Sequence, residues 1–377
     1  MDPQVLEFAI NVGPAAILGF SALQLLWFGL VAVLFAGYFF LEGFDYGAGA
    51  MMPFVGRSNE ERRLVHNTLG PIWDGNEVWL LTAGGAVFAA FPHWYASMFS
   101  GLYLALFLML LALILRIVSF EFRNKRPDPV WQTRWDMILA GCSALMAILW
   151  GAAVTNLVTG VPIDFGSIQY GGTFWHILGP QDILGGLCFL ALFCYYGCLF
   201  LDIKTEDKAL QTRIKNYAPK LFVAMLVMLL TWLALMFFMS NMFVDRLGIG
   251  ELGFGLGIIA GFKVIPLALI AIAAVALLLS ILFFMKGNSK LAFFCTGGGI
   301  IFFTFAVFFG MFPYVLMSNT VPGWGLTVAI ASSSQTTLTL MTIVAVCLVP
   351  VVLLYQGWTY WVFRKRITVE SLKTSEY

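Results

Sequence analysis

Asp74 and Glu77 lie three residues apart inside a long apolar stretch of the chain. Placing one ionised carboxylate at the centre of a bilayer costs roughly 2.5–3.5 kcal/mol on insertion scales, so acids at such positions are rare and usually functional. A carboxyl group in apolar surroundings can hold and release a proton near neutral pH. Because a spacing of three residues places both groups on one helix face, the pair predicts a proton-transfer site.

Further titratable residues extend this predicted site toward one side of the membrane. His66 precedes Asp74 by two helical turns and is expected on the same face. Glu42 and Asp45 lie at the cytoplasmic end of the preceding predicted helix and suit proton uptake. Two alternatives stay open for these acids, which are solvation at the helix end or pairing with Arg57, Arg62 or Arg63.

Aromatic and basic residues near these acids have two interpretations each. Trp73 and Trp79 flank the acidic pair and either line a gap through which oxygen passes or pack against neighbouring helices. Arg116 lies near the inner end of a predicted helix, where it either pairs with Glu121 or extends to the lipid headgroups. Extension to the headgroups is the expectation for Arg116.

The chain has few residues that could hold a redox centre. It contains three histidines and six cysteines, without a haem-attachment motif or a metal-ligand spacing. We therefore expect no metal site and no catalytic haem ligand in this chain. Any electron chemistry is expected to belong to a partner.

Composition identifies an all-α polytopic membrane protein. Hydrophobic residues make up 60% of the 377 and charged residues 11%. Apolar segments of about 20 residues recur, which is the length that a helix needs to cross a bilayer. About nine helices are predicted, at 22–45, 62–88, 93–121, 132–158, 180–202, 215–241, 258–285, 290–312 and 334–362.

The basic residues predict the orientation of these helices. All of the 21 Lys and Arg residues except Arg246 and Lys263 fall on one side of the predicted bundle. Cytoplasmic loops collect basic residues, so the N-terminus is expected outside and the C-terminus in the cytoplasm. The predicted organisation is an outer N-terminal segment (1–20), a single membrane domain (21–363) and a cytoplasmic tail (364–377). The net charge of +1 is uninformative about partners, because the basic residues report orientation, and no nucleic-acid partner is implied.

Several motifs resemble subunit II of the cytochrome bd quinol oxidases, a family of bacterial terminal oxidases. The resemblance covers nearly the whole chain from about residue 25, and its most specific part is the run WDGNEVWLLTAGGA with FAAFP after it. The other matching segments are 43–47, 59–63, 156–162, 312–314, 333–339 and 366–368.

The resemblance implies a subunit of an enzyme that oxidises ubiquinol or menaquinol and reduces oxygen in the inner membrane. It implies two four-helix bundles plus a peripheral helix, and a partner subunit I that carries haems b and d. Small single-helix subunits, membrane lipids, quinol and a bound structural quinone are further expected partners. Asp74 matches an aspartate of the family's proton route and Trp79 a tryptophan beside its proposed oxygen route, whereas Glu77 and Glu42 replace Gln and Asp.

Two other functions stay open from the sequence. A proton-coupled transporter also uses carboxylates inside the membrane. A purely structural subunit would stabilise the haem-bearing partner and carry no protons.

Overall fold

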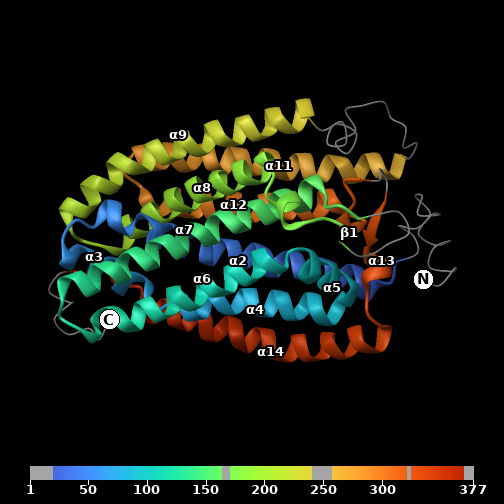
Figure 1. Cartoon of the computed structure of the whole chain (residues 1–377), viewed down its shortest axis with the longest axis horizontal. Coiled ribbons are helices and arrows are strands. Elements are labelled where there is room, and N and C mark those ends of the chain that lie inside the picture. The colour runs from blue at the N-terminus through green and yellow to red at the C-terminus, as the bar shows by residue number, and fades with distance from the viewer. Residues whose placement is uncertain (1–19, 164–169, 240–256, 321–323, 369–377) are drawn as a thin grey trace.

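The computed structural model describes residues 20–163, 170–239, 257–320 and 324–368. Within these ranges the chain is almost entirely helical, and the long helices run side by side along the longest axis of the molecule (Figure 1). The predicted N-terminal segment 1–20 lies outside the described residues except for its last residue, as does most of the tail 364–377.

The first long helix, α2 (Ala22–Val55), begins with a capping box in which Ser21 and Gln24 exchange hydrogen bonds. We expected this helix to end near residue 45, but it continues for ten more residues. The added residues from Tyr46 to Met52 are small or apolar and all buried, so packing supports the extra turns. The extension places Glu42 and Asp45 inside the helix and away from its end.

Two predicted helices are each divided in two. Instead of one helix over 62–88, the chain forms α3 (Asn59–Leu69) and α4 (Trp73–Ala90), which are separated by a turn at residues 70–72. Pro71 within this turn lacks a backbone N–H and disfavours a continuous helix. Instead of one helix over 93–121, the chain forms α5 (Pro92–Gly101) and α6 (Tyr103–Phe122).

The remaining predicted helices are present with ends close to those expected. They are α7 (Pro129–Thr159), α8 (Pro180–Lys204), α9 (Lys208–Met239), α11 (Gly257–Met285), α12 (Ser289–Met311) and α14 (Gln335–Val362). Short 3-10 helices, η2 (Arg123–Lys125) and η3 (Phe174–Ile177), and one short α-helix, α13 (Val328–Ala331), lie in the connections. Among the described residues, eight helices are long and apolar enough to cross a membrane. The predicted segment 62–88 has no counterpart among these eight, because it forms the broken pair α3 and α4.

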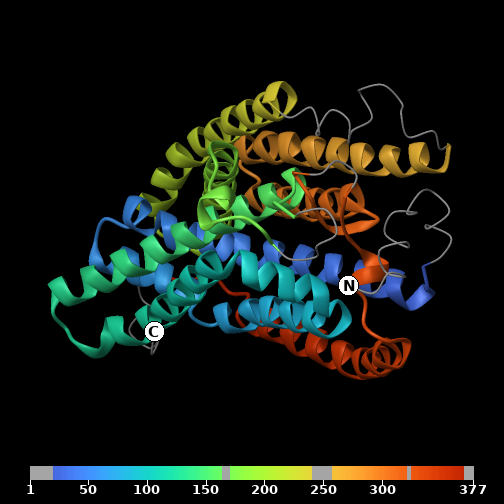
Figure 2. The same ribbon diagram turned by 45° about the vertical axis from the view of Figure 1, so that its right-hand side comes forward.

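Helix α2 lies at the centre of the molecule. It packs against α7, α8 and α12 on one side and against α4 on the other, with α14 on the outer side of α4 (Figures 1 and 2). The backbones of α2 and α8 touch at Gly47 and Gly197, where a Cβ atom would lie 1.6 Å from the Phe193 carbonyl oxygen and 2.1 Å from the Ala48 nitrogen, respectively. Small residues thus let these helices approach closely. The arrangement as two four-helix bundles stays a prediction.

A two-stranded sheet lies at the end of the molecule opposite α3 (Figure 1). Strand β1 (Tyr314–Met317) pairs antiparallel with β2 (Gly325–Thr327). The sequence predicted an irregular connection here, so the sheet is a small departure from an all-α fold. Its strands are too short for a period of two residues to be recognised.

Candidate functional site

The centre of the candidate site is an ion pair between α2 and α6. The Arg116 side chain is 0% exposed and donates from Nη2 to Asp45 Oδ1, and Asp45 is also 0% exposed. The second nitrogen, Arg116 Nη1, lies 3.6 Å from Glu42 Oε2. Because Asp45 and Glu42 are one helical turn apart, both carboxylates face the same guanidinium.

Helix α4 contributes a third carboxylate and an amide to this buried cluster. Glu77 is 8% exposed and interacts electrostatically with Arg116 and Asp45. Asn76 donates from Nδ2 to Asp45 Oδ2 over 3.4 Å, and Tyr360 of α14 donates to Asn76 Oδ1 over 2.6 Å. Side chains of four helices therefore meet at the cluster.

The cluster contains more acidic than basic groups. Three carboxyl groups, those of Glu42, Asp45 and Glu77, surround one guanidinium group, that of Arg116. Neither carboxylate oxygen of Glu42 has a hydrogen-bond partner, although both oxygens are buried. Because Asp45 already pairs with the guanidinium, a second or third ionised carboxylate in such surroundings is strongly disfavoured, so the arrangement can bind a proton.

Asp74 lies outside this cluster. Its side chain is exposed at the surface of the chain and makes no hydrogen bond or ion pair with the described residues, whereas Glu77 points into the interior. The two carboxylates still interact electrostatically. The expectation of one shared face is therefore wrong in detail, because residues three apart differ by about 60° around a helix axis.

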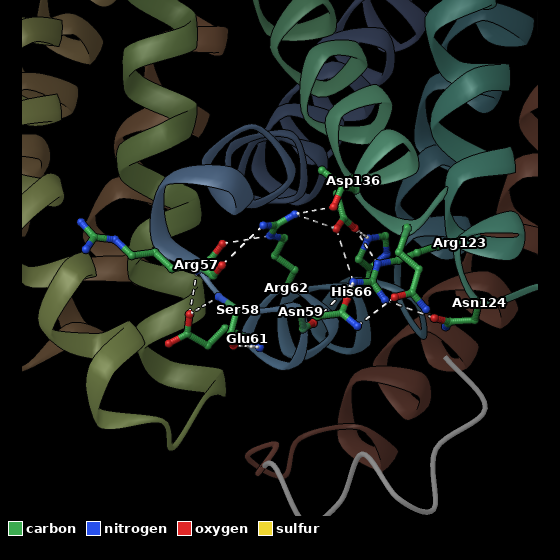
Figure 3. Close-up of polar contacts among 12 residues, drawn as sticks. Arg57, Ser58, Asn59, Glu61, Arg62, His66, Arg123, Asn124 and Asp136 are labelled. Carbon is green, nitrogen blue, oxygen red and sulfur yellow. Dashed lines mark hydrogen bonds and ion pairs between the residues drawn. The ribbon is translucent and has the colours of Figure 1, made fainter. Parts of the chain in front are cut away.

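His66 belongs to a second polar cluster (Figure 3). Its Nε2 lies 2.9 Å from Asp136 Oδ1, which also accepts from Arg123 Nε over 2.5 Å. Arg62 Nη1 reaches Asp136 Oδ2 over 3.4 Å, and Arg123 Nη2 donates to Asn59 Oδ1 over 2.6 Å. The expected alignment of His66 with Asp74 along one helix is wrong, because the turn at 70–72 separates α3 from α4.

Glu61 connects α3, on which it lies, to α9. Its carboxylate accepts from the backbone nitrogens of Arg57 and Ser58 over 2.7 and 2.9 Å and from the Arg213 side chain. Partial burial alone would raise the pKa of Glu61, but the hydrogen bonds from Arg213, Ser58 and Arg57 outweigh burial and hold the pKa below its usual value. Arg57 and Arg62 thus contact other groups. Neither forms the ion pair with Glu42 or Asp45 that was one of the two alternatives.

Both tryptophans near Asp74 make contacts within the chain. Trp73 stacks on Phe120 with ring centroids 5.9 Å apart. Trp79 donates from Nε1 to Gln356 Oε1 over 2.7 Å, and its ring packs against Gly37. These contacts show packing, and oxygen passage beside them stays a prediction.

The sequence interpretation also placed Arg116 wrongly. We expected its side chain to extend to the headgroups, yet it is fully buried against Asp45. The sequence does contain a signal for this pairing, since one apolar helix contains an arginine and another contains two acids. Asn76 and Tyr360 were also not selected as site residues, because amides and phenols in apolar helices are common.

The described residues hold no group of three or more His, Cys, Asp or Glu side chains arranged for a metal ion. The three histidines lie in three different elements, α3, α5 and η3. His66 is committed to Asp136, and the Nδ1 atom of His176 accepts from the Thr173 nitrogen over 3.0 Å. His93 is an exposed residue in the first turn of α5.

Comparisons with known proteins agree with one another. Residues 23–363 match the family model described as cytochrome bd terminal oxidase subunit II. Cytochrome bd ubiquinol oxidase subunit 2 of Bacillus subtilis is 38% identical over 348 residues, which cover 92% of this chain and 98% of that protein. Cytochrome bd-I ubiquinol oxidase subunit 2 of Escherichia coli is 33% identical over 377 residues, which cover 95% and 98%, respectively.

A solved structure shares the fold. A chain of the bd oxidase from Geobacillus thermodenitrificans superposes with a TM-score of 0.71 at 13% sequence identity. The match covers 92% of this chain and 100% of that chain.

Proposed function

Because the chain belongs to the cytochrome bd terminal oxidase subunit II family, we propose that its buried carboxylates carry protons toward the oxygen-reducing partner subunit. The chain is a multi-pass membrane subunit of a bacterial quinol oxidase, and membership of this family implies a subunit I partner and haem cofactors in the complex. Family membership also decides against the transporter alternative. The observation that supports the relay is the cluster of Glu42, Asp45 and Glu77 around a single buried arginine.

The three carboxyl groups have different roles in this proposal. Asp45 is ion-paired and hydrogen-bonded to Arg116 and accepts from Asn76, so it remains ionised and fixes the cation. One positive charge cannot neutralise three carboxylates in a medium of low dielectric constant. Glu42 and Glu77 therefore hold the exchangeable protons, and a proton passes from α2 to α4 between them.

Asp74 would pass the proton out of this chain. It lies on an outward stripe of α4, of which Leu81 is 71% and Phe88 59% exposed. A Cβ atom added to Gly75, Gly84 or Gly85 on this helix would meet nothing within 4 Å, which leaves room for another helix to approach. Because a carboxylate is not stable against lipid tails, we propose that subunit I covers this stripe and receives the proton from Asp74.

The proton would come from the end of the molecule that contains α3. Basic residues of several connections meet there, since Arg213 contacts Glu61 and Arg366 donates to the Ile203 carbonyl over 2.9 Å. Basic loops face the cytoplasm, so this end is the cytoplasmic side in our proposal, and the described part of the tail reaches it at Arg366. Glu42 and Asp45 are nearer this end of α2 than its beginning at Ala22.

Haems b and d are proposed to belong to subunit I. No step at a haem is assigned to this chain. The part assigned to this chain is to hold and move protons at Glu42, Glu77 and Asp74.

The test replaces each relay residue in the assembled oxidase, which is purified with subunit I. We expect Asp74→Asn, Glu77→Gln and Glu42→Gln to lower oxygen consumption by about 100-fold, the usual contribution of a positioned proton donor or acceptor. The haem absorption spectrum should stay unchanged. Glu121→Gln is the matched control, because Glu121 is an exposed acid at the cytoplasmic end of α6.

The same measurement decides between the relay and the purely structural alternative. Normal oxygen consumption in all three variants, with normal haem content, would leave this subunit as a scaffold. Loss of haem together with activity in every variant would also favour the scaffold.

A further inference from the structure

A chain of hydrogen bonds runs through the core from α7 to α2. Trp150 of α7 donates from Nε1 to the Tyr38 hydroxyl oxygen over 2.9 Å. The hydroxyl oxygens of Tyr38 and Tyr46 lie 2.6 Å apart. Both tyrosines are 0% exposed and Trp150 is 8% exposed, so water at the surface cannot replace these partners.

The Trp150 end of this chain has one possible direction of donation. An indole N–H can only donate, so the Tyr38 oxygen accepts from Trp150. If Tyr38 in turn donates to Tyr46, each hydroxyl of the pair is used once as an acceptor. The hydrogen of the Tyr46 hydroxyl then remains available for another acceptor.

A buried acceptor without a donor lies one turn away on the same helix. Glu42 precedes Tyr46 by four residues, and neither of its carboxylate oxygens has a hydrogen-bond partner. Leaving such a group unsatisfied is costly, so a donor one helical turn away is favoured. The Tyr46 ring is held beside the cluster, since Arg116 Cζ lies 4.8 Å from its centroid.

We propose that Tyr46 is a positioning residue for Glu42 and donates its hydroxyl hydrogen to the Glu42 carboxyl group. Trp150 fixes the direction of the chain from its far end. The inference rests on the proposed function, in which Glu42 holds an exchangeable proton. It adds that a proton cannot leave Glu42 toward Trp150, because the indole nitrogen has no lone pair with which to accept one. The tyrosine pair therefore directs the proton of Glu42 toward Glu77.

The experiment measures the Glu42 carboxyl band in the infrared difference spectrum between the oxidised and reduced forms of the assembled oxidase. Glu42→Gln identifies the band by its loss. Removing a hydrogen-bond donor from a carboxyl group strengthens its C=O bond, so we expect Tyr46→Phe to move the band to higher wavenumber. Trp150→Phe should move it in the same direction by less, because Trp150 acts through two hydroxyl groups.

Tyr196→Phe is the matched control. Tyr196 is also fully buried, and its hydroxyl group has no hydrogen-bond partner. Its loss should change neither the band nor oxygen consumption, whereas Tyr46→Phe should slow oxygen consumption by about tenfold, as the loss of one hydrogen bond predicts.

The outcomes separate this inference from the proposed function. If the Glu42 band does not move in Tyr46→Phe, the proposed hydrogen bond is wrong, even if Glu42→Gln consumes oxygen slowly. A moved band together with normal oxygen consumption in Glu42→Gln would support the hydrogen bond and remove Glu42 from the relay.

Discussion

Asp45 and Arg116 form an ion pair that is completely buried within the chain. The two residues are 71 positions apart in the sequence and lie on α2 and α6. Arg116 Cζ also lies over the rings of Tyr46 and Phe120, 4.8 and 5.7 Å from their centroids. Aromatic side chains therefore enclose the cation, and the carboxyl groups beside it have little water to stabilise their charges.

Replacing Arg116 with Met should destabilise the subunit strongly. The change would leave Asp45 as an uncompensated buried charge, which typically costs about 3–5 kcal/mol. The double variant Arg116→Met with Asp45→Asn should recover part of this loss, because no unpaired charge then remains at Asp45. Thermal unfolding of the purified complex measures both effects. A double variant that is no more stable than Arg116→Met alone would contradict the pairing.

Replacing Asp136 with Asn should loosen the contact of α3 with α6 and α7. Asp136 lies between Arg62, His66 and Arg123, so its neutralisation leaves the buried Arg123 guanidinium group without its anion. We expect a loss of about 3 kcal/mol or more in unfolding free energy. Asp128→Asn is a suitable control, since Asp128 is an exposed N-cap residue of the same helix and Asn also caps helices well. Equal stability of the two variants would contradict this role.

Acidification should release the contact between Glu61 and α9. The pKa of Glu61 is lower in the folded chain than in the unfolded chain, because its hydrogen bonds outweigh partial burial. Its stabilising contribution is therefore complete above the unfolded pKa of about 4.3 and is lost as the pH falls through the lower folded value.

Hydrogen–deuterium exchange measures this release. The protection factors of the Arg57 and Ser58 amides, which donate to Glu61, should fall across that acidic range. In Glu61→Gln, the protection factors should be lower at neutral pH and change less on acidification. If the protection factors of Glu61→Gln fall on acidification as much as those of the unsubstituted protein, titration of other groups causes the fall.

Replacing Gln356 with Leu should weaken the attachment of α14. Gln356 accepts from Trp79 over 2.7 Å and donates to the Gly75 carbonyl over 3.2 Å, and few other polar contacts join α14 to α4. Each lost hydrogen bond is worth about 1 kcal/mol, and the Trp79 N–H would be left without an acceptor. Faster proteolysis in the connection before α14 would report this change. Gln335→Leu at the beginning of α14 should have a smaller effect, because the Gln335 side chain donates to the Ser21 hydroxyl oxygen in an exposed contact.

The membrane class and most helix positions could be predicted from the sequence. Residues 129–159, 180–204 and 289–311 form helices close to those expected, because a run of apolar residues is a local property. The family could also be recognised from local motifs, and the comparisons confirm it. The acids Glu42, Asp45 and Glu77 were identified because charge within an apolar run is unusual wherever the run is placed.

Tertiary packing decided which partners these residues have. Arg116 meets Asp45 only because α2 continues past residue 45 and α6 lies near it, and neither condition is visible in the residues around Arg116. The turn at 70–72 and the rotation of α4 direct Asp74 outward and Glu77 inward. Spacing along a helix defines relative angles, but contacts with other helices decide which angle faces the core. The sequence alone therefore determined which groups could carry protons, and the packing determined how those groups are connected.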